Sequence, residues 1–289
     1  IVKPVQSDFT FEFSDVRKKI SLNIENSLID TIINLAAIHK TPGHNHNEYF
    51  DTNIKGAINV CDFARKNNIN TIIFTSSISV YGTYEEKKSE QTLPMPDIPY
   101  GISKLTAEYI HKQWYSEDPV HRRLIILRPG VVFGMYEKAN FTRLINSLNG
   151  KYFAYVGRKD TKKACVYVKD LVQVIIFFSK NKSIKHDTFN VAYTPTLSIE
   201  KIVKSVSKIG GFNWPRFTLP KWMIFFLSSI LYYIFMKKDF NPIRMNKLIV
   251  SNNIDAKKIN KIIKFNFGFS KGIADWMDDV DFKNKKKIY

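Results

Sequence analysis

Cysteine is scarce in this 289-residue chain, which contains Cys61, Cys165 and no other. Two thiols cannot form a framework of disulfides, so we expect a reducing compartment and a cytoplasmic protein. The spacing of cysteine and histidine that is typical of zinc fingers is also missing. His39, His44 and His46 fall in a predicted loop without a carboxylate or cysteine set at ligand spacing. No metal site is therefore predicted.

Acidic residues are few, with 26 Asp and Glu against 44 Lys and Arg, and the formal net charge is +18. Such an excess suits an anionic partner, which could be a nucleic acid, a membrane surface or a phosphorylated ligand. It is equally consistent with lysine having accumulated at exposed positions without a function. The lysines are spread over the whole length and no aromatic signature of RNA binding occurs, so nucleic acid is not predicted as a partner.

Long apolar runs are also lacking. The uncharged apolar segment Trp222–Met236 lies between Lys221 and Lys237 and has 15 residues. A membrane-spanning helix needs about 20 such residues, so a buried helix or a helix lying on a membrane surface is expected instead. The segment leaves peripheral membrane contact open.

Short apolar segments rich in β-branched residues alternate with stretches of helical periodicity through the first two-thirds of the chain. Near-continuous hydrophobicity in the short segments is typical of strands in a parallel sheet covered on both faces. The alternation predicts an α/β fold with a doubly wound, Rossmann-like parallel sheet. The predicted strands are Thr10–Ser14, Thr31–Ala37, Thr71–Ser76 and Leu124–Arg128, and the predicted helices are Asn53–Lys66 and Tyr100–Trp114.

The pattern becomes less regular after Gly134. We interpret this part as a smaller C-terminal substrate lobe that closes over the carboxyl edge of the sheet, where ligands of open α/β folds bind. The expected division is residues 1–135 for the sheet domain and 136–289 mainly for the lobe, with some elements returning to the sheet. The predicted strands here are Cys165–Val168 and Thr188–Ala192, and the predicted helices are Asp170–Ser179 and Ser198–Lys208.

Tyr100 and Lys104 carry the sharpest chemical signal. They are four residues apart on a predicted helix, so they share one face, one turn apart. A phenol with a pKa of about 10 is a poor base at neutral pH. A neighbouring ammonium lowers this pKa by stabilising the phenolate, which allows proton exchange with a carbinol or ketone. Alone, the pair is weak evidence, because two common residue types recur at this spacing by chance.

A serine cluster, Ser76, Ser77 and Ser79, follows the predicted strand Thr71–Ser76. The carboxyl end of a strand is where an α/β sheet presents side chains to a ligand. A serine hydroxyl at that place can hydrogen-bond a substrate oxygen while Tyr100 moves the proton. Beside the Tyr100–Lys104 pair, the cluster predicts an active site.

These motifs resemble the extended short-chain dehydrogenase/reductase superfamily, in its NAD-dependent epimerase/dehydratase branch, over nearly the whole chain. The resemblance implies that Ser77, Tyr100 and Lys104 are catalytic and that Tyr100 and Lys104 also contact the cofactor. It implies NAD, with NADP not excluded, and a nucleotide-sugar substrate. It further suggests a homodimer through the helices that contain Asn53 and Tyr100.

Other matches to the family concern the cofactor and the substrate. The resemblance implies contacts from an acidic turn, a strand end, the start of a helix and the nicotinamide loop. The cofactor-binding residues implied in this way are Asp15, Val16, Leu35, Ala36, Ala37, Asn53 and Gly130. The substrate-binding residues implied are Ser77, Asn140, Lys163 and Arg244, of which Lys163 and Arg244 would neutralise a diphosphate.

The first departure from the family is a missing glycine-rich loop. No Gly-x-x-Gly-x-x-Gly loop, whose backbone N–H groups approach a pyrophosphate, occurs in the sequence. The family places this loop ahead of the turn at Asp15, which only 14 residues precede here. We therefore expect a fragment without the first strand, helix and second strand. The alternative is a natural chain that has lost cofactor binding.

Three further departures concern the reaction. Ile78 and Ser79 follow Ser77 where dehydratases of this branch carry an acidic residue, which disfavours dehydration. Lys163 stands at the position of the family's phosphate-binding arginine and lacks its bidentate fork. Val131 stands where many sugar epimerases have asparagine, so the sugar chemistry is left open.

The sequence thus predicts an NAD(P)-dependent epimerase or ketoreductase that acts on a nucleotide-diphosphate sugar. One alternative is a membrane-associated 3β-hydroxysteroid or sterol-type dehydrogenase, motivated by the segment Trp222–Met236 and by Val131. The other is a catalytically inactive relative, motivated by the missing glycine loop.

Overall fold

The structure is a computed structural model that describes residues 10–22, 29–39, 43–215, 217–223 and 249–282. A four-stranded sheet with the order β1-β2-β3-β8 forms its centre, and all neighbouring strands are parallel. The strands are β1 (Thr31–Asn34), β2 (Thr71–Thr75), β3 (Arg123–Pro129) and β8 (His186–Val191). The predicted doubly wound parallel sheet is confirmed.

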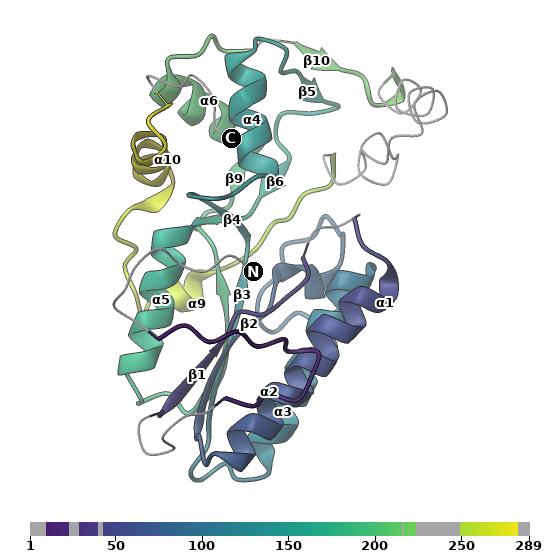
Figure 1. Cartoon of the computed structure of the whole chain (residues 1–289). Coiled ribbons are helices and arrows are strands. Elements are labelled where there is room, and N and C mark those ends of the chain that lie inside the picture. Colours follow the sequence, from purple (N-terminus) through teal and green to yellow (C-terminus); the bar gives the residue numbers. More distant parts are fainter. Residues whose placement is uncertain (1–9, 23–28, 40–42, 216, 224–248, 283–289) are drawn as a thin grey trace.

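Alternation along the central strands divides their side chains between two layers of helices. Ile72 and Phe74 of β2 pack with the pair α2 (Gly56–Lys66) and α3 (Pro99–Ser116). Ile73, between them, faces the opposite way and packs with α5 (Val168–Lys180). Figure 1 shows α5 and the α2–α3 pair on opposite sides of the sheet. Because both faces are covered, the strands need apolar residues at every position, which is the pattern seen in the sequence.

A second lobe follows the sheet and has a core of its own. It contains β4 (Val131–Phe133) paired with β7 (Cys165–Tyr167), β5 (Tyr155–Val156) paired with β10 (Thr218–Leu219), and β6 (Lys162–Lys163) paired with β9 (Leu197–Ser198). Its helices are α4 (Asn140–Asn149), α6 (Ile199–Gly210) and α10 (Gly268–Asp279), which pack around Phe133, Tyr167 and Trp276. Figure 1 shows α4, α6, β5 and β10 at the end of the molecule away from β1.

Short elements connect the larger ones. A single α-helical turn α1 (His46–Tyr49) runs into a π-helical turn η1 (Phe50–Lys55) and then into α2. A 3₁₀ turn η2 (Ile78–Tyr81) follows β2, and α9 (Lys257–Asn260) packs against β8. The chain between β7 and β8 forms α5, so this part returns from the second lobe to the sheet.

The predicted strand Thr10–Ser14 is wrong. These residues form no strand, Phe13 is 68% exposed, and β1 is an edge of the described sheet. A strand exists only where its backbone pairs with a neighbour, and the described part of the chain gives this segment none. Most of the apolar segment Trp222–Met236 lies outside the described residues. None of the helices that the structure describes has both the length and the apolarity to cross a bilayer.

Candidate active site

Ser77 and Tyr100 meet at the carboxyl edge of the sheet. Ser77 lies just after β2 as the N-terminal cap of η2, where its hydroxyl accepts a hydrogen bond from Ser79 N at 3.1 Å. Tyr100 is in the first turn of α3, whose start is fixed by Pro99. Burial raises the pKa of Tyr100, and the nearby hydroxyl of Ser77 acts in the opposite direction with a smaller effect. The structure thus brings together the hydroxyl and the phenol that the sequence predicted.

Lys104 lies one turn further along α3 and is 1% exposed. Burial disfavours its charged form and lowers the pKa of Lys104 to about 7, while the nearby charge of Glu108 acts in the opposite direction. Its ammonium lies 4.3 Å from the ring centroid of Phe74 and makes no hydrogen bond or ion pair among the described residues. Such a cation can bind a hydroxyl group or a negative charge of a ligand that enters the site.

The net shift of Tyr100 is opposite to the predicted one. The sequence suggested that the Lys104 ammonium lowers the pKa of the phenol, whereas burial raises the pKa of Tyr100. Because the pKa of Lys104 is itself lowered to about 7, part of the population holds a neutral amine at neutral pH. Activation of Tyr100 by Lys104 therefore stays a prediction.

Asn53 connects three parts of the site. It lies in η1 and is buried, and its side-chain oxygen accepts a hydrogen bond from Ile38 N at 2.9 Å. Its amide nitrogen donates to Ile38 O at 3.2 Å and to Ser103 Oγ at 2.8 Å. Asn53 thus ties the segment after β1 to α3. Helical turns of the π type are frequent at functional sites, and here the turn directs a polar side chain into the protein.

The predicted cofactor-binding residues Leu35, Ala36 and Ala37 directly follow β1 at the carboxyl edge. Leu35 is 59% exposed, and Ala36 N donates to the side chain of Asn34 at 3.2 Å. Gly130 follows β3, where a Cβ atom would lie 2.7 Å from the carbonyl oxygen of Ala164. Only glycine fits this approach of the backbone to its neighbour.

The predicted acidic turn packs against α2. The Asp15 carboxylate accepts hydrogen bonds from the Arg17 backbone N–H and guanidinium, which together lower the pKa of Asp15 to about 2. The carbonyl of Val16 accepts from Asn59 Nδ2 at 2.7 Å. A Cβ atom on Gly56 would lie 3.0 Å from Val16 Cγ2, so glycine allows the turn to dock closely.

The predicted substrate-binding residues of the second lobe are less well defined. Asn140 is the first residue of α4 and is exposed. Lys163 lies on β6, where its ammonium donates to the carbonyl of Val250 at 2.9 Å and burial lowers the pKa of Lys163 to about 8. Arg244 lies outside the described residues.

A buried polar network beneath the site was not found from the sequence. Arg128 of β3 and Glu108 of α3 form a two-point ion pair, with Nη2–Oε2 at 2.5 Å and Nε–Oε1 at 2.8 Å. Ser76, next to Ser77, donates to Glu108 Oε1 at 2.6 Å. Arg128 Nη1 also donates to the hydroxyl of Tyr81 at 2.9 Å. The sequence shows Glu108 one turn beyond Lys104, but its spacing does not show that this carboxylate is buried.

His111 is a second buried ionisable group that the sequence did not single out. Its ring stacks on Phe74 with centroids 4.2 Å apart, and Nδ1 lies 2.7 Å from the carbonyl oxygen of Ala107. Its Nε2 lies 3.3 Å from the side-chain nitrogen of Asn34. Burial lowers the pKa of His111 to about 4. The imidazole is therefore neutral at physiological pH.

Acid is expected to destabilise the fold through His111. Its pKa is lowered from 6.5 to about 4, so the unfolded chain binds a proton that the folded chain does not hold in this range. The free energy of unfolding should fall by about 2 kcal/mol between about pH 7 and pH 5, before most carboxylates titrate. Urea denaturation at several pH values measures this slope. The slope should become shallower in His111→Gln and persist in His121→Gln, whose histidine is exposed; equal slopes in both variants would exclude His111 as the cause.

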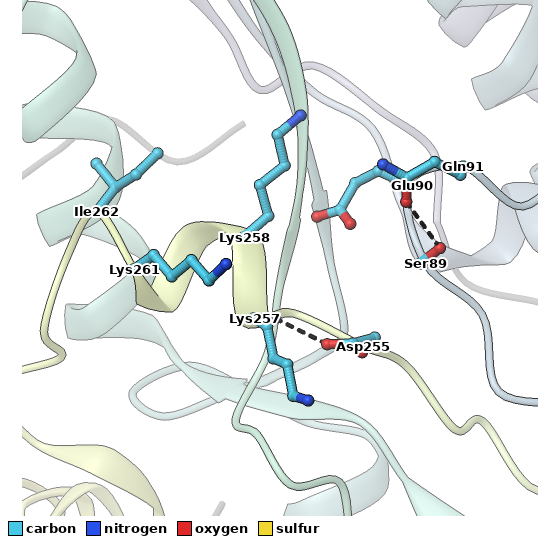
Figure 2. A pocket seen from close by; sticks show the side chains of 8 residues that line it. All are labelled: Ser89, Glu90, Gln91, Asp255, Lys257, Lys258, Lys261 and Ile262. Carbon is cyan, nitrogen blue, oxygen red and sulfur yellow. Dashed lines mark hydrogen bonds between the residues drawn. The ribbon is translucent and has the colours of Figure 1, made fainter.

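An open pocket of about 480 Å³ lies elsewhere, between the segment Ser89–Gln91 and α9. Figure 2 shows Lys257, Lys258 and Lys261 around it, with Glu90 on the other side. Glu90 accepts a hydrogen bond from the backbone N–H of Asn190 at 2.8 Å. None of the residues that line this pocket belongs to the predicted catalytic set. In the part of the chain that the structure describes, no group of three or more His, Cys, Asp or Glu residues could hold a metal ion.

The chain matches a known protein family. Residues 3–192 match the NAD dependent epimerase/dehydratase family. The chain belongs to this family. The family that the sequence motifs suggested is thereby confirmed, and with it an NAD-dependent enzyme class.

Similar proteins include several 4-epimerases. The chain is 30% identical over 254 residues to the N-acetyl-alpha-D-glucosaminyl-diphospho-ditrans,octacis-undecaprenol 4-epimerase of Escherichia coli O157:H7, which spans 86% of this chain and 76% of that protein. The UDP-glucuronic acid 4-epimerase from Bacillus cereus, solved with NAD, superposes with a TM-score of 0.70 at 22% identity and covers 95% of this chain and 82% of its own. The UDP-N-acetylglucosamine 4-epimerase from Bacillus cereus gives 0.69 at 21% identity, with 94% and 86% covered. At these identities the solved structures show the shared fold.

The described residues of this family member fit the nicotinamide end of NAD. Lys104 is a buried cation without a hydrogen-bond partner among the described residues, and a ribose offers the hydroxyl groups that such a cation can bind. Tyr100 and Ser77 lie beside it with hydroxyl groups for a substrate oxygen. The pyrophosphate end has no matching glycine loop in the sequence. The fit therefore covers the reacting end of the cofactor.

Proposed function

We propose that this protein is an NAD-dependent 4-epimerase of a sugar carried on a diphosphate. The observation that supports this most is the placement of Tyr100 beside Ser77, with buried Lys104 one helical turn away. An alcohol carbon can be inverted by removing its hydrogen as hydride and returning it to the other face. When bound, NAD supplies the acceptor and donor of this hydride.

The residues of the chain supply the proton chemistry. As the phenolate, Tyr100 would take the proton of the sugar hydroxyl when hydride leaves, and the resulting phenol would return the proton when hydride comes back, because Tyr100 lies beside Ser77 at the mouth of the sheet. Ser77 holds the reacting oxygen by a hydrogen bond. Lys104 would bind the nicotinamide ribose and favour the phenolate through its charge. Burial excludes water, which strengthens each of these interactions.

The diphosphate of the substrate would bind on the second lobe. Lys163 offers a positive charge on β6, and Asn140 offers an amide at the start of α4, where helix N-terminal N–H groups favour anions. A diphosphate bound here would account for part of the excess of basic residues, so a nucleic-acid partner is not needed to explain it. The UDP-sugars in the names of the solved neighbours carry such a diphosphate.

A lipid-linked substrate is favoured over a free nucleotide sugar by one feature of the second lobe. Three aromatic side chains near β5 and β10 are strongly exposed: Phe217 by 79%, Tyr152 by 72% and Trp222 by 71%. Exposed aromatic rings beside lysines are typical of proteins that touch a bilayer interface. The E. coli relative is named for a sugar diphosphate on undecaprenol. Peripheral membrane contact therefore belongs to this proposal.

A two-substrate assay of the full-length enzyme with NAD tests both parts. The expected result is inversion at C4 of N-acetylglucosamine on diphospho-undecaprenol in vesicles, without net change of cofactor absorbance, and slower inversion of UDP-N-acetylglucosamine. Faster turnover of the UDP-sugar would overturn the lipid-linked assignment and keep the epimerase. Net NADH formation, or no turnover of either compound, would overturn the epimerase itself.

A homodimer is also part of this proposal. The outer faces of α2 and α3 expose apolar side chains, with Ile58, Ile102 and Tyr109 each at least 41% exposed. Neighbouring apolar residues on two adjacent helices suit the same pair of helices on a second copy. Light scattering of the purified full-length protein measures the oligomeric state.

A further inference from the structure

The active site rests on a buried charge pair that the proposed mechanism does not use directly. Glu108 is 0% exposed and Arg128 is 3% exposed, so both charges have left water. Desolvation of a charged pair is costly, and such a pair often adds little stability over apolar residues of the same size. A purely structural role is therefore a weak explanation for its position beneath Lys104 and Ser77.

Glu108 is linked to two parts of the proposed site, Ser77 and Lys104. Its Oε1 accepts from Ser76, whose neighbour Ser77 touches Tyr100. On its own helix α3, Glu108 lies one turn beyond Lys104, and its charge raises the pKa of that lysine against the effect of burial.

On the side of Arg128, the pair is positioned by η2 and β8. Arg128 is fixed by the Tyr81 hydroxyl, which in turn donates to Asn190 Oδ1 of β8 at 2.8 Å. One hydrogen-bonded network thus joins Glu108 of α3 to Arg128 of β3 and, through Arg128, to η2 and β8.

We propose that Glu108 is a positioning residue that keeps the Lys104 ammonium charged and fixes Ser77 through Ser76. The inference rests on the role proposed for Lys104, because a charged lysine matters only if it faces a ligand. The charged and titratable groups around the two residues are Arg128 from β3, Tyr81 from η2, and Tyr100 and His111 from α3. His111 is neutral at physiological pH because burial lowers its pKa, which leaves Glu108 as the described anion that acts on Lys104.

Direct titration of Lys104 tests the inference without turnover. In the full-length protein labelled with lysine ¹³Cε, a resonance should titrate near neutral pH, below that of Lys163 and apart from the exposed lysines, and this resonance should vanish in Lys104→Met. In Glu108→Gln its midpoint should move down by about one pH unit, because the favourable charge is lost. In Glu117→Gln, which removes a carboxylate near the exposed end of the same helix, the midpoint should not move.

Activity provides the second readout. With Lys104 less often charged, Glu108→Gln should lower kcat/KM by about 10-fold, and the alkaline fall of the pH profile should begin at lower pH. An unchanged midpoint of Lys104 in Glu108→Gln would overturn the inference and leave the pair a structural contact. An equal shift in Glu117→Gln would overturn it too.

A charge-balanced variant covers the possibility that Glu108→Gln does not fold. Glu108→Leu combined with Arg128→Met removes both charges with side chains of similar size. The Lys104 midpoint should again move down in this variant, and an unchanged midpoint would overturn the inference. If the midpoint moves as expected while the full-length enzyme inverts neither sugar, the proposed function fails and the electrostatic coupling of Glu108 to Lys104 stands.

Discussion

Replacing Tyr100 with phenylalanine is expected to lower kcat/KM of the full-length enzyme by at least about 10²–10⁴-fold, the usual contribution of a positioned proton-transfer group. The substitution removes one oxygen from the first turn of α3 and leaves the ring, so the packing against Tyr49, whose ring centroid lies 6.4 Å away, is retained. Steady-state kinetics with either sugar substrate measures the loss.

A matched control lies on the same helix. Tyr109 of α3 is 58% exposed, and Tyr109→Phe removes the same atom without touching Ser77 or Lys104. Its kinetics should equal those of the unchanged enzyme. Binding of NAD, measured by calorimetry, should change far less than turnover in Tyr100→Phe, because most of the loss lies in the transition state. Turnover within a few-fold of the unchanged enzyme in Tyr100→Phe would exclude the proposed role of the phenol.

The second large effect concerns stability. Arg128→Met leaves the Glu108 carboxylate buried without its partner, and it also removes the donor to Tyr81. Breaking a buried ion pair from one side costs about 3–5 kcal/mol. Chemical denaturation should show this fall in the free energy of unfolding, with an unchanged denaturant slope.

Two variants distinguish this cause from a general loss of arginine. Arg65→Met breaks ion pairs with Asp62 and Glu117 that are partly open to solvent, and it should cost less than about 1 kcal/mol. Removing both charges in Glu108→Leu with Arg128→Met should recover most of the stability. A single Arg128→Met variant as stable as Arg65→Met would show that the buried pair is not a coupled unit.

The sequence predicted the sheet well because its strands are buried on both faces. Continuous apolar runs identified β2 and β3 to within one residue at each end, since no polar face interrupts them. It failed at Thr10–Ser14 because a run of alternating aromatic residues shows the tendency to be extended and cannot show a pairing partner. The bounds of α3 were predicted nearly as well, owing to Pro99 at its start.

The candidate site was predictable where chemistry is local in the sequence. Tyr100 and Lys104 share a helix and Ser77 follows a strand, so their spacing, together with the resemblance to the family, pointed to them. The Glu108–Arg128 pair joins residues 20 positions apart on a helix and a strand, and only the packing of α3 on β3 shows that both are buried. The same holds for His111, whose partner Asn34 is 77 positions away.

The all-parallel sheet has a consequence for how the chain reaches its native state. Thr31 of β1 pairs with Thr71 of β2, and Leu124 of β3 pairs with His186 of β8, so every ladder joins segments far apart along the chain. Closing such long loops costs entropy before any strand contact repays it, and chains of this topology fold slowly. Until the strands have paired, their apolar side chains are exposed to other molecules. In newly made chains, aggregation with other copies therefore competes with folding.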